Sequence, residues 1–265
     1  MFLFSGGAFA QNDDAAAEMA RAMQNPLANM KALMTDNAIG FDTGTDGGTS
    51  YGFQFQPVYA IDYPEKGFTL IPRAVVPLLA LEPGTQAPPT GGGPIPGGSS
   101  RAAGLGDSIL QLFFAPYIEG DWKWGIGPQV SLRTHTDSDL EGPGWGAGVA
   151  GVVTGGISDE VSFAGIVSQH WGFSGDFSTT SIQPMFYYNI ASNPGAVLMY
   201  NAATTIDWKA PSGNRLTIPL GFAYGKTFAF SGGGGIDLNI GPYYNVVRPD
   251  GAARWTLRFG VSWIF

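Results

Sequence analysis

The stretch Trp255-Thr-Leu-Arg-Phe-Gly-Val-Ser-Trp-Ile-Phe265 has a large apolar residue at every second position. Successive side chains of a β-strand point to opposite sides, so this pattern predicts a strand with one apolar face. Its length is about that of a strand that crosses a membrane. The apolar set ends on an aromatic residue, and we expect it to act as the signal for the outer-membrane assembly machinery: Trp255, Leu257, Phe259, Val261, Trp263 and Phe265.

The same alternation recurs through the chain, as in 122–133, 182–190, 215–224 and 236–246. It predicts about twelve strands, an even number, as bacterial single-chain barrels require. The expected strands are 27–37, 49–61, 68–81, 105–117, 122–135, 145–155, 160–172, 178–190, 196–208, 215–225, 234–246 and 253–265. The first is the least regular, because 29–36 could equally extend a preceding helix.

Alternation alone does not say whether the apolar faces meet lipid or a protein core. Three features favour a membrane barrel over a soluble β-sandwich. Aromatic residues cluster near strand ends, as in Trp122/Trp124, Tyr187/Tyr188 and Trp263/Phe265, where interfacial girdles belong. The apolar faces are longer than the usual 5–6 residues of a sandwich strand. The last strand also ends on an aromatic residue. We therefore predict an all-β fold, a transmembrane antiparallel up-and-down β-barrel with a short N-terminal helix.

Composition agrees with this fold class. The chain of 265 residues has 40 glycines and 13% aromatic residues, while only 13% of its residues are charged. That mixture suits strands and glycine-rich turns better than a helical enzyme or a disordered chain. The net charge of −8 argues against a nucleic-acid partner, and the absence of cysteine excludes disulfides and thiolate sites.

The first residues predict export. Ala8-Phe9-Ala10 resembles a signal-peptidase cleavage site, although the preceding stretch is too short for a full signal peptide. We expect 1–10 to be residual signal peptide, 11–26 a periplasmic segment with a helix over 13–24, and 27–265 an outer-membrane barrel. This places the protein in the outer membrane of a Gram-negative bacterium, with membrane lipid around it.

The connections fit a barrel that starts in the periplasm. The expected periplasmic turns are 62–67, 118–121, 156–159, 191–195 and 226–233. The expected external connections are 38–48, 82–104, 136–144, 173–177, 209–214 and 247–252, and the longest, 82–104, is rich in Pro, Gly and Ser. Seven prolines fall within expected strands, so we predict bulges or strand ends there: Pro72, Pro77, Pro116, Pro128, Pro184, Pro219 and Pro242.

Several motifs together resemble one bacterial family. They are Gln24-Asn-Pro-Leu-Ala-Asn29, Gly104-Leu-Gly-Asp107, Trp124-Gly-Ile-Gly-Pro-Gln129, 168–176, 208–221 and Tyr244-Asn-Val-Val-Arg-Pro-Asp250. The chain from about Gln24 to Phe265 is similar to the outer-membrane family labelled meta-pathway of phenol degradation, or transporter, and in places mislabelled neuromedin U. The resemblance implies an outer-membrane barrel for the uptake of aromatic or other small hydrophobic compounds. The 82–104 loop has no counterpart in it.

Charged residues on the polar faces are candidates for lining the lumen: Arg73, Lys123, Arg133, Asp207, Arg215, Asp237 and Arg258. Such charges can filter solutes. They can equally form ion pairs that fill a narrow interior, and we expect most of them to do so.

No catalytic, cofactor or metal site is expected. His135 and His170 are the only histidines. A barrel phospholipase has its serine ten residues after its histidine, where this chain has Trp145 and Thr180. His170, beside Trp171, is expected at the membrane interface. The preferred function is thus a porin-like channel for a small-molecule solute of unknown identity. The alternatives are a non-conducting outer-membrane barrel with an enzymatic or structural role, and a secreted ligand-binding β-sandwich.

Overall fold

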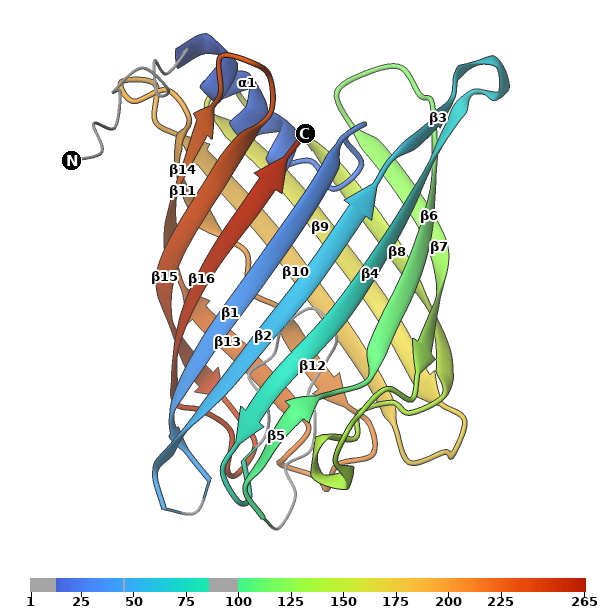
Figure 1. Ribbon diagram of the computed structural model, residues 1–265, viewed down its shortest axis with the longest axis vertical. Coiled ribbons are helices and arrows are strands. Elements are labelled where there is room, and N and C mark those ends of the chain that lie inside the picture. Colours follow the sequence, from blue (N-terminus) through green and yellow to red (C-terminus); the bar gives the residue numbers. More distant parts are fainter. Residues whose placement is uncertain (1–12, 45, 86–99) are drawn as a thin grey trace, which may run out of the picture.

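In the computed structural model, which describes residues 13–44, 46–85 and 100–265, the chain forms a closed antiparallel β-barrel (Figure 1). The sheet closes because β1 (Lys31–Thr43) pairs with both β2 (Gly48–Tyr59) and β16 (Trp255–Ile264). In sequence order, the other strands of the wall are β3 (Ile61–Tyr63), β4 (Phe68–Leu81), β5 (Ala102–Leu105), β6 (Ser108–Pro116), β7 (Lys123–Leu132), β8 (Gly146–Gly156), β9 (Val161–Gly172), β10 (Ser178–Asn189), β11 (Ala196–Tyr200), β12 (Thr204–Asp207), β13 (Leu216–Gly221), β14 (Ala223–Ala229) and β15 (Gly235–Val247).

Four of these wall segments are interrupted strands. β2 continues as β3, β5 as β6, β11 as β12, and β13 as β14. The described residues therefore form a barrel of twelve strands, counting each interrupted strand once. The predicted all-β barrel of about twelve strands is confirmed. One helix, α1 (Asp13–Met23), precedes it, as predicted for 13–24. No helix in the described part is long and apolar enough to cross a membrane. The expected signal peptide remnant, 1–10, lies outside the described residues.

The first predicted strand was misplaced. β1 begins at Lys31 and runs to Thr43, whereas 27–37 was expected, so the expected connection 38–48 shrinks to the tight turn after Thr43. The alternation continues through Ile39 and Phe41, and the chain reverses only where Asp42, Gly44 and Gly47 adopt positive φ angles. Leu27 precedes the strand and packs inside the barrel.

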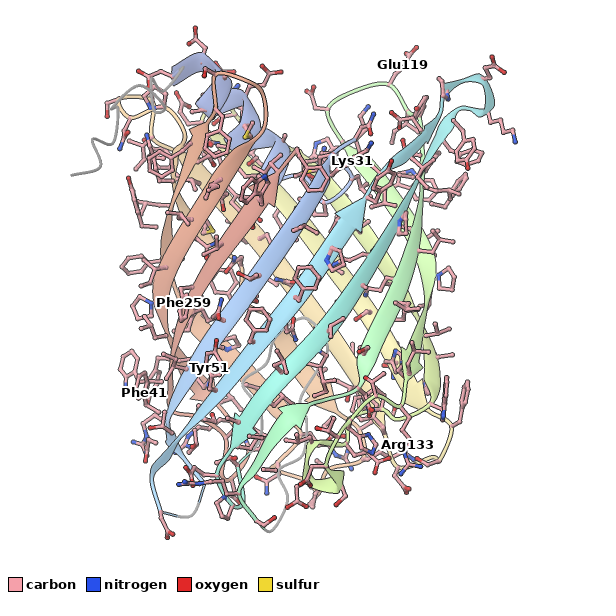
Figure 2. The ribbon with its side chains drawn as sticks, viewed as in Figure 1. Lys31, Phe41, Tyr51, Glu119, Arg133 and Phe259 are labelled. Carbon is pink, nitrogen blue, oxygen red and sulfur yellow. The ribbon has the colours of Figure 1, made fainter. Side chains whose placement is uncertain are left out.

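The two ends of the barrel differ. α1 and the C-terminus lie at one mouth (Figure 1). Figure 2 places Lys31 and Glu119 at this mouth and Arg133 at the other. The connections at the α1 mouth are short, whereas the other mouth carries the long connections 82–101 and 133–145. Of the predicted 82–104 loop, 86–99 lie outside the described residues and 102–104 belong to β5. Since external loops are the longer ones, we infer that the α1 mouth faces the periplasm.

The alternating apolar faces point outward. Ile126, Val167 and Trp263 are each more than half exposed on the barrel wall, while Gln129, Ser131 and Ser262 face inward and are buried. Near the periplasmic end, Trp122, Phe163 and Phe186 form a row of rings with centroids 6.1 and 5.0 Å apart. An apolar exterior with aromatic rows is what a membrane barrel requires, so this protein belongs in the outer membrane.

Two residues expected in the interfacial girdle lie inside the barrel instead. Tyr187 and His170 have the inward parity of β10 and β9, and they are 8% and 4% exposed. Their neighbours Tyr188 and Trp171 point outward and are about half exposed. Nearness to a strand end was the wrong criterion, because parity decides which of two adjacent residues faces lipid.

The prolines lie where the ladder to a neighbouring strand is interrupted, but only Pro116 is at a strand end and only Pro219 at a register shift, the kinds of position that were predicted. Pro184 falls between the β12 and β11 partners of β10, and Pro242 between the β14 and β13 partners of β15. Pro72 lies opposite the gap between β2 and β3, and Pro77 opposite the gap between β5 and β6. Pro116 is the last residue of β6, Pro128 lies in an unpaired stretch of the β6–β7 register, and Pro219 lies at a register shift.

The outward face predicts how the barrel responds to charge. We expect Val167→Arg, at the middle of β9, to destabilise the folded barrel by about 2–4 kcal/mol, because the guanidinium would lie near the bilayer midplane. Phe173→Arg, in the external turn after β9, should cost only about 0–1 kcal/mol. Urea unfolding in lipid vesicles, with faster gel migration of unheated protein as the folded signal, measures both. Equal losses would contradict the assignment of this face to lipid.

Candidate functional site: the lumen

The lumen is divided along its axis, and its external half is polar. Gln111 on β6 donates from Nε2 to Oε1 of Gln129 on β7 at 2.8 Å. This amide pair links β6 to β7 from within, and the buried, inward-facing Ser131 and other Ser and Thr residues add to the polar surface. This half matches the polar lumen that the sequence predicts.

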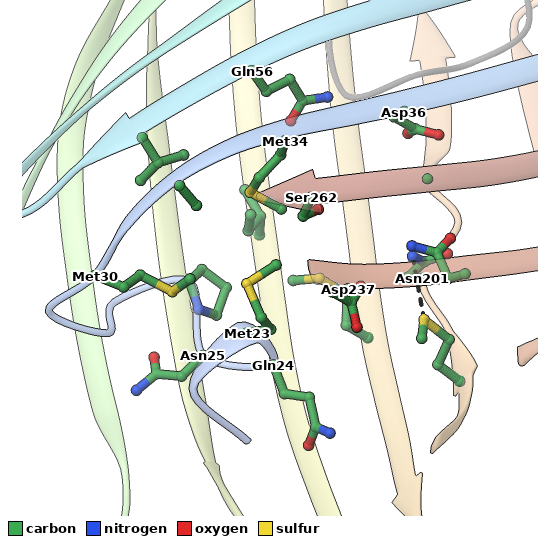
Figure 3. A pocket seen from close by; sticks show the side chains of 18 of the residues that line it. Met23, Gln24, Asn25, Met30, Met34, Asp36, Gln56, Asn201, Asp237 and Ser262 are labelled. Atoms are coloured by element: carbon green, nitrogen blue, oxygen red, sulfur yellow. Dashed lines mark hydrogen bonds between the residues drawn. The ribbon is translucent and has the colours of Figure 1, made fainter. Parts of the chain in front are cut away.

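The periplasmic half is different, because methionine side chains converge there. Five of the seven methionines line one cavity of about 170 Å³ (Figure 3): Met23, Met30, Met34, Met185 and Met199. Phe113, Val152, Ile166 and Tyr187 complete its apolar wall. An apolar section therefore interrupts the polar lumen in this half. Parity could have shown it, since Met30, Met34 and Asp36 share one face.

α1 closes part of the periplasmic mouth. Ala16 and Ala20 are buried, and the helix packs on β14, β15 and β11. Gly235 leaves room there for the Met19 side chain, which a Cβ would meet. Across the mouth, Arg21 Nη2 donates to the carbonyl of Asp159 at 3.1 Å, in the β8–β9 turn. The helix thus spans one side of the mouth, from β15 and β14 to the β8–β9 turn (Figure 1).

The end of α1 is anchored by one glutamine. Gln24 donates from Nε2 to Asn189 Oδ1 at 2.7 Å and accepts from the Ser162 hydroxyl at 2.6 Å. Gln24 also lines the methionine cavity and a second cavity of about 370 Å³, which lies between α1 and the β8–β9 turn. This residue therefore stands between the lumen and the remaining opening to the periplasm.

The structure brings together three of the seven predicted lumen residues. Arg73, Asp237 and Arg258 all line the methionine cavity. Arg258 forms an ion pair with Asp36, stacks on the Tyr243 ring and donates to the Asn201 carbonyl. Asp237 accepts from the Thr227 hydroxyl at 2.8 Å. The sequence reading overlooked Asp36 and Asn201, which the same parity argument would have placed inside.

The other four predicted residues lie near the strand ends. Lys123 donates to the carbonyl of Ile118 at the periplasmic end. At the external end, Arg133 has a side chain that is 58% exposed, and its Nε lies 4.0 Å from Glu141. Asp207 caps the backbone at Lys209, and Arg215 Nε donates to the Ala210 carbonyl at 2.8 Å. These contacts hold turns together rather than line the cavity.

The structure pairs Ser131 with His170, a contact that the sequence spacing did not indicate. Ser131 Oγ and His170 Nε2 are 2.9 Å apart, and both residues are buried in the external half. His170 Nδ1 has no hydrogen-bond partner among the described residues, so the third member of a catalytic triad is missing. The described residues also contain no cluster of three or more groups suited to a metal.

At the external mouth, Asp107 organises the 133–145 connection. Its Oδ1 accepts from the backbone N–H of Thr134 and His135 and lies 2.7 Å from His135 Nδ1. Its Oδ2 accepts from the N–H groups of Gly142 and Gly144 at 2.9 and 2.7 Å. The carboxylate is inaccessible to solvent, and Leu140 of the same connection is fully buried. Asp107 therefore fixes the shape of this loop.

Comparison with solved structures finds the same fold in outer-membrane channels. An outer-membrane channel from Pseudomonas putida F1 matches with a TM-score of 0.60 and 12% identity, over 91% of this chain and 98% of its own. The NanC porin matches with a TM-score of 0.51 and 10% identity, over 88% of this chain and 98% of its own. No family model and no curated protein sequence matches the chain. The comparison shows the barrel fold, and the resemblance to the phenol-degradation family remains a prediction.

The role of Asp107 can be tested by proteolysis. Asp107→Ala should remove hydrogen bonds to a charged group, each worth about 1.5–3 kcal/mol, and so release the 133–145 connection. We expect trypsin added to intact cells to cleave the variant protein after Arg133 about ten-fold faster than the wild-type protein. The reason is that the 133–145 connection opens locally more often. Asp137→Ala, which loses only a contact to the Asp139 N–H, is the matched control. Equal cutting of the wild type and Asp107→Ala would show that Asp107 does not hold the loop.

Proposed function

We propose that this barrel is a channel of the bacterial outer membrane that admits small molecules with an apolar, often aromatic, body. The observation that carries the proposal is the convergence of five methionines on one cavity inside the barrel. A lumen that serves only ions and water has no use for such a surface. Methionine is flexible and polarisable, so a group of methionines can adapt to apolar solutes of different shape.

The polar groups around the cavity suit a passing solute better than a reacting one. They come from opposite walls, as Gln56 and Asn201 do, and most of them are engaged with each other or with the backbone. Such groups orient a solute without tight binding, which is what passage requires. The fold of known channels and the resemblance to a family with a role in aromatic uptake support the same function.

α1 sets the width of the route at the periplasmic mouth. The double variant Arg21→Ala/Gln24→Ala removes its contacts to the β8–β9 turn, β9 and β10, so the helix end should leave the mouth more often. We expect the single-channel conductance in potassium chloride to rise about two-fold or more in planar bilayers. Glu18→Ala, on the exposed face of α1, is the control. A barrel that stays closed with and without these anchors would favour the non-conducting alternative.

The methionine cavity should determine which neutral solutes interrupt the current. Benzamide, a neutral aromatic, should reduce the potassium chloride current, and acetamide, which lacks the ring, should not. In Met34→Gln/Met185→Gln, the benzamide concentration that halves the current should rise about ten-fold, because polar side chains replace apolar ones of similar length.

The control for this experiment is Met34→Leu/Met185→Leu, which keeps the wall apolar. It should retain the benzamide effect. If the glutamine and leucine variants behave alike, or if acetamide acts as strongly as benzamide, the cavity does not select apolar solutes.

A further inference from the structure

Two arginines face the methionine cavity, and their surroundings differ. Arg258 is compensated by the Asp36 carboxylate, the Asn201 carbonyl and the Tyr243 ring. Arg73 has no carboxylate within 4.0 Å in the described part of the chain, and its hydrogen-bond partner is the neutral Gln56 amide. Its Nε atom is buried and lacks a partner among the described residues, as does the Nε atom of Arg258.

The position of Arg73 within the cavity is equally specific. It lies inward on β4 at the level of Val58 on β2 and Gln111 on β6. Two residues earlier on the same face is Ile71, which pairs with Phe113, and both belong to the apolar cluster that includes Val152. The guanidinium therefore stands at the edge of an apolar wall.

A partly buried guanidinium with no carboxylate in ion-pair contact favours an anion, and its planar fork matches a carboxylate. We propose that Arg73 is an anion-binding residue for the solute, so that the preferred solute is a small carboxylate with an apolar body. The carboxylate binds at Arg73, and the body lies against Ile71, Phe113 and the flexible Met30 and Met34. This inference rests on the proposed channel function and names the class of solute.

The arrangement also gives a reason why only one of the two cavity arginines lacks an ion-pair contact. A solute that bound two free arginines would be retained, whereas a single contact at the wall orients it and then releases it. Arg258, already neutralised by Asp36, contributes structure and no second anion site.

The test compares solutes that share a ring or a carboxylate. In planar bilayers of the full chain, sodium benzoate should halve the potassium chloride current at about one-tenth of the concentration that benzamide or acetate needs. In Arg73→Gln the benzoate-to-benzamide ratio should fall to about one. Arg73→Lys keeps the charge but loses the fork, and it should give an intermediate ratio. Arg254→Gln, at an exposed arginine paired with Asp42, should keep the wild-type ratio.

Several results would overturn the proposal. The proposal is wrong if the wild type shows no preference for benzoate over benzamide. It is also wrong if Arg73→Gln keeps the wild-type benzoate-to-benzamide ratio. If Arg73→Gln does not reach the heat-modifiable folded form, a wild-type ratio in Arg73→Lys would count against the guanidinium fork. If benzamide does not reduce the current of the wild type, the result contradicts the proposed apolar channel itself rather than the role of Arg73.

Discussion

The structure depends on one constraint, namely that backbone polar groups within a membrane need partners inside the protein. Neither water nor lipid can supply them in the hydrocarbon region, so the sheet has to close on itself. The pairing of β1 with β16 does this through a continuous register from Ala32↔Ile264 to Phe41↔Trp255. With every edge paired, the apolar alternation faces lipid all round, and the opposite faces create a lumen.

The same constraint explains much of the polar chemistry inside. Where the ladder is interrupted around Pro184, Pro219 and Pro242, backbone carbonyls lose their strand partners. Asn201 O instead accepts from Gln183 Nε2 at 2.8 Å and from Arg258 Nη1 at 3.2 Å, and Pro219 O accepts from the Tyr200 hydroxyl at 2.7 Å. Arg258 thus hydrogen-bonds to the backbone of the wall in addition to forming its ion pair with Asp36. A charged residue that parity places in the lumen is therefore not always available to bind a solute.

The fold was predictable because the alternation has a period of two and persists for whole strands. β4 and β16 follow their expected ranges closely, and the proline interruptions follow from the missing N–H. The start of β1 was not predictable in this way. The residues before Lys31 have no alternation, and only their packing inside the barrel as part of the loop after α1 decides the boundary. Asp107 was equally hidden, because its five contacts come from a loop that follows it by 27 to 37 residues.

The candidate site was predictable only in part, since parity gives the side of the wall but neither the depth nor the partner. Arg73 and Arg258 have the same inward parity, yet Arg73 meets the Gln56 amide on the preceding strand β2, whereas Arg258 meets the Asp36 carboxylate on β1, at the other end of the sequence. Depth matters in the same way for methionine. On the outer face a methionine would meet lipid, whereas the five methionines contributed by α1, the segment before β1 and the inner face of the wall give the lumen an apolar section. An apolar section beside an arginine without an ion-pair partner is the feature that the proposed solute would fill.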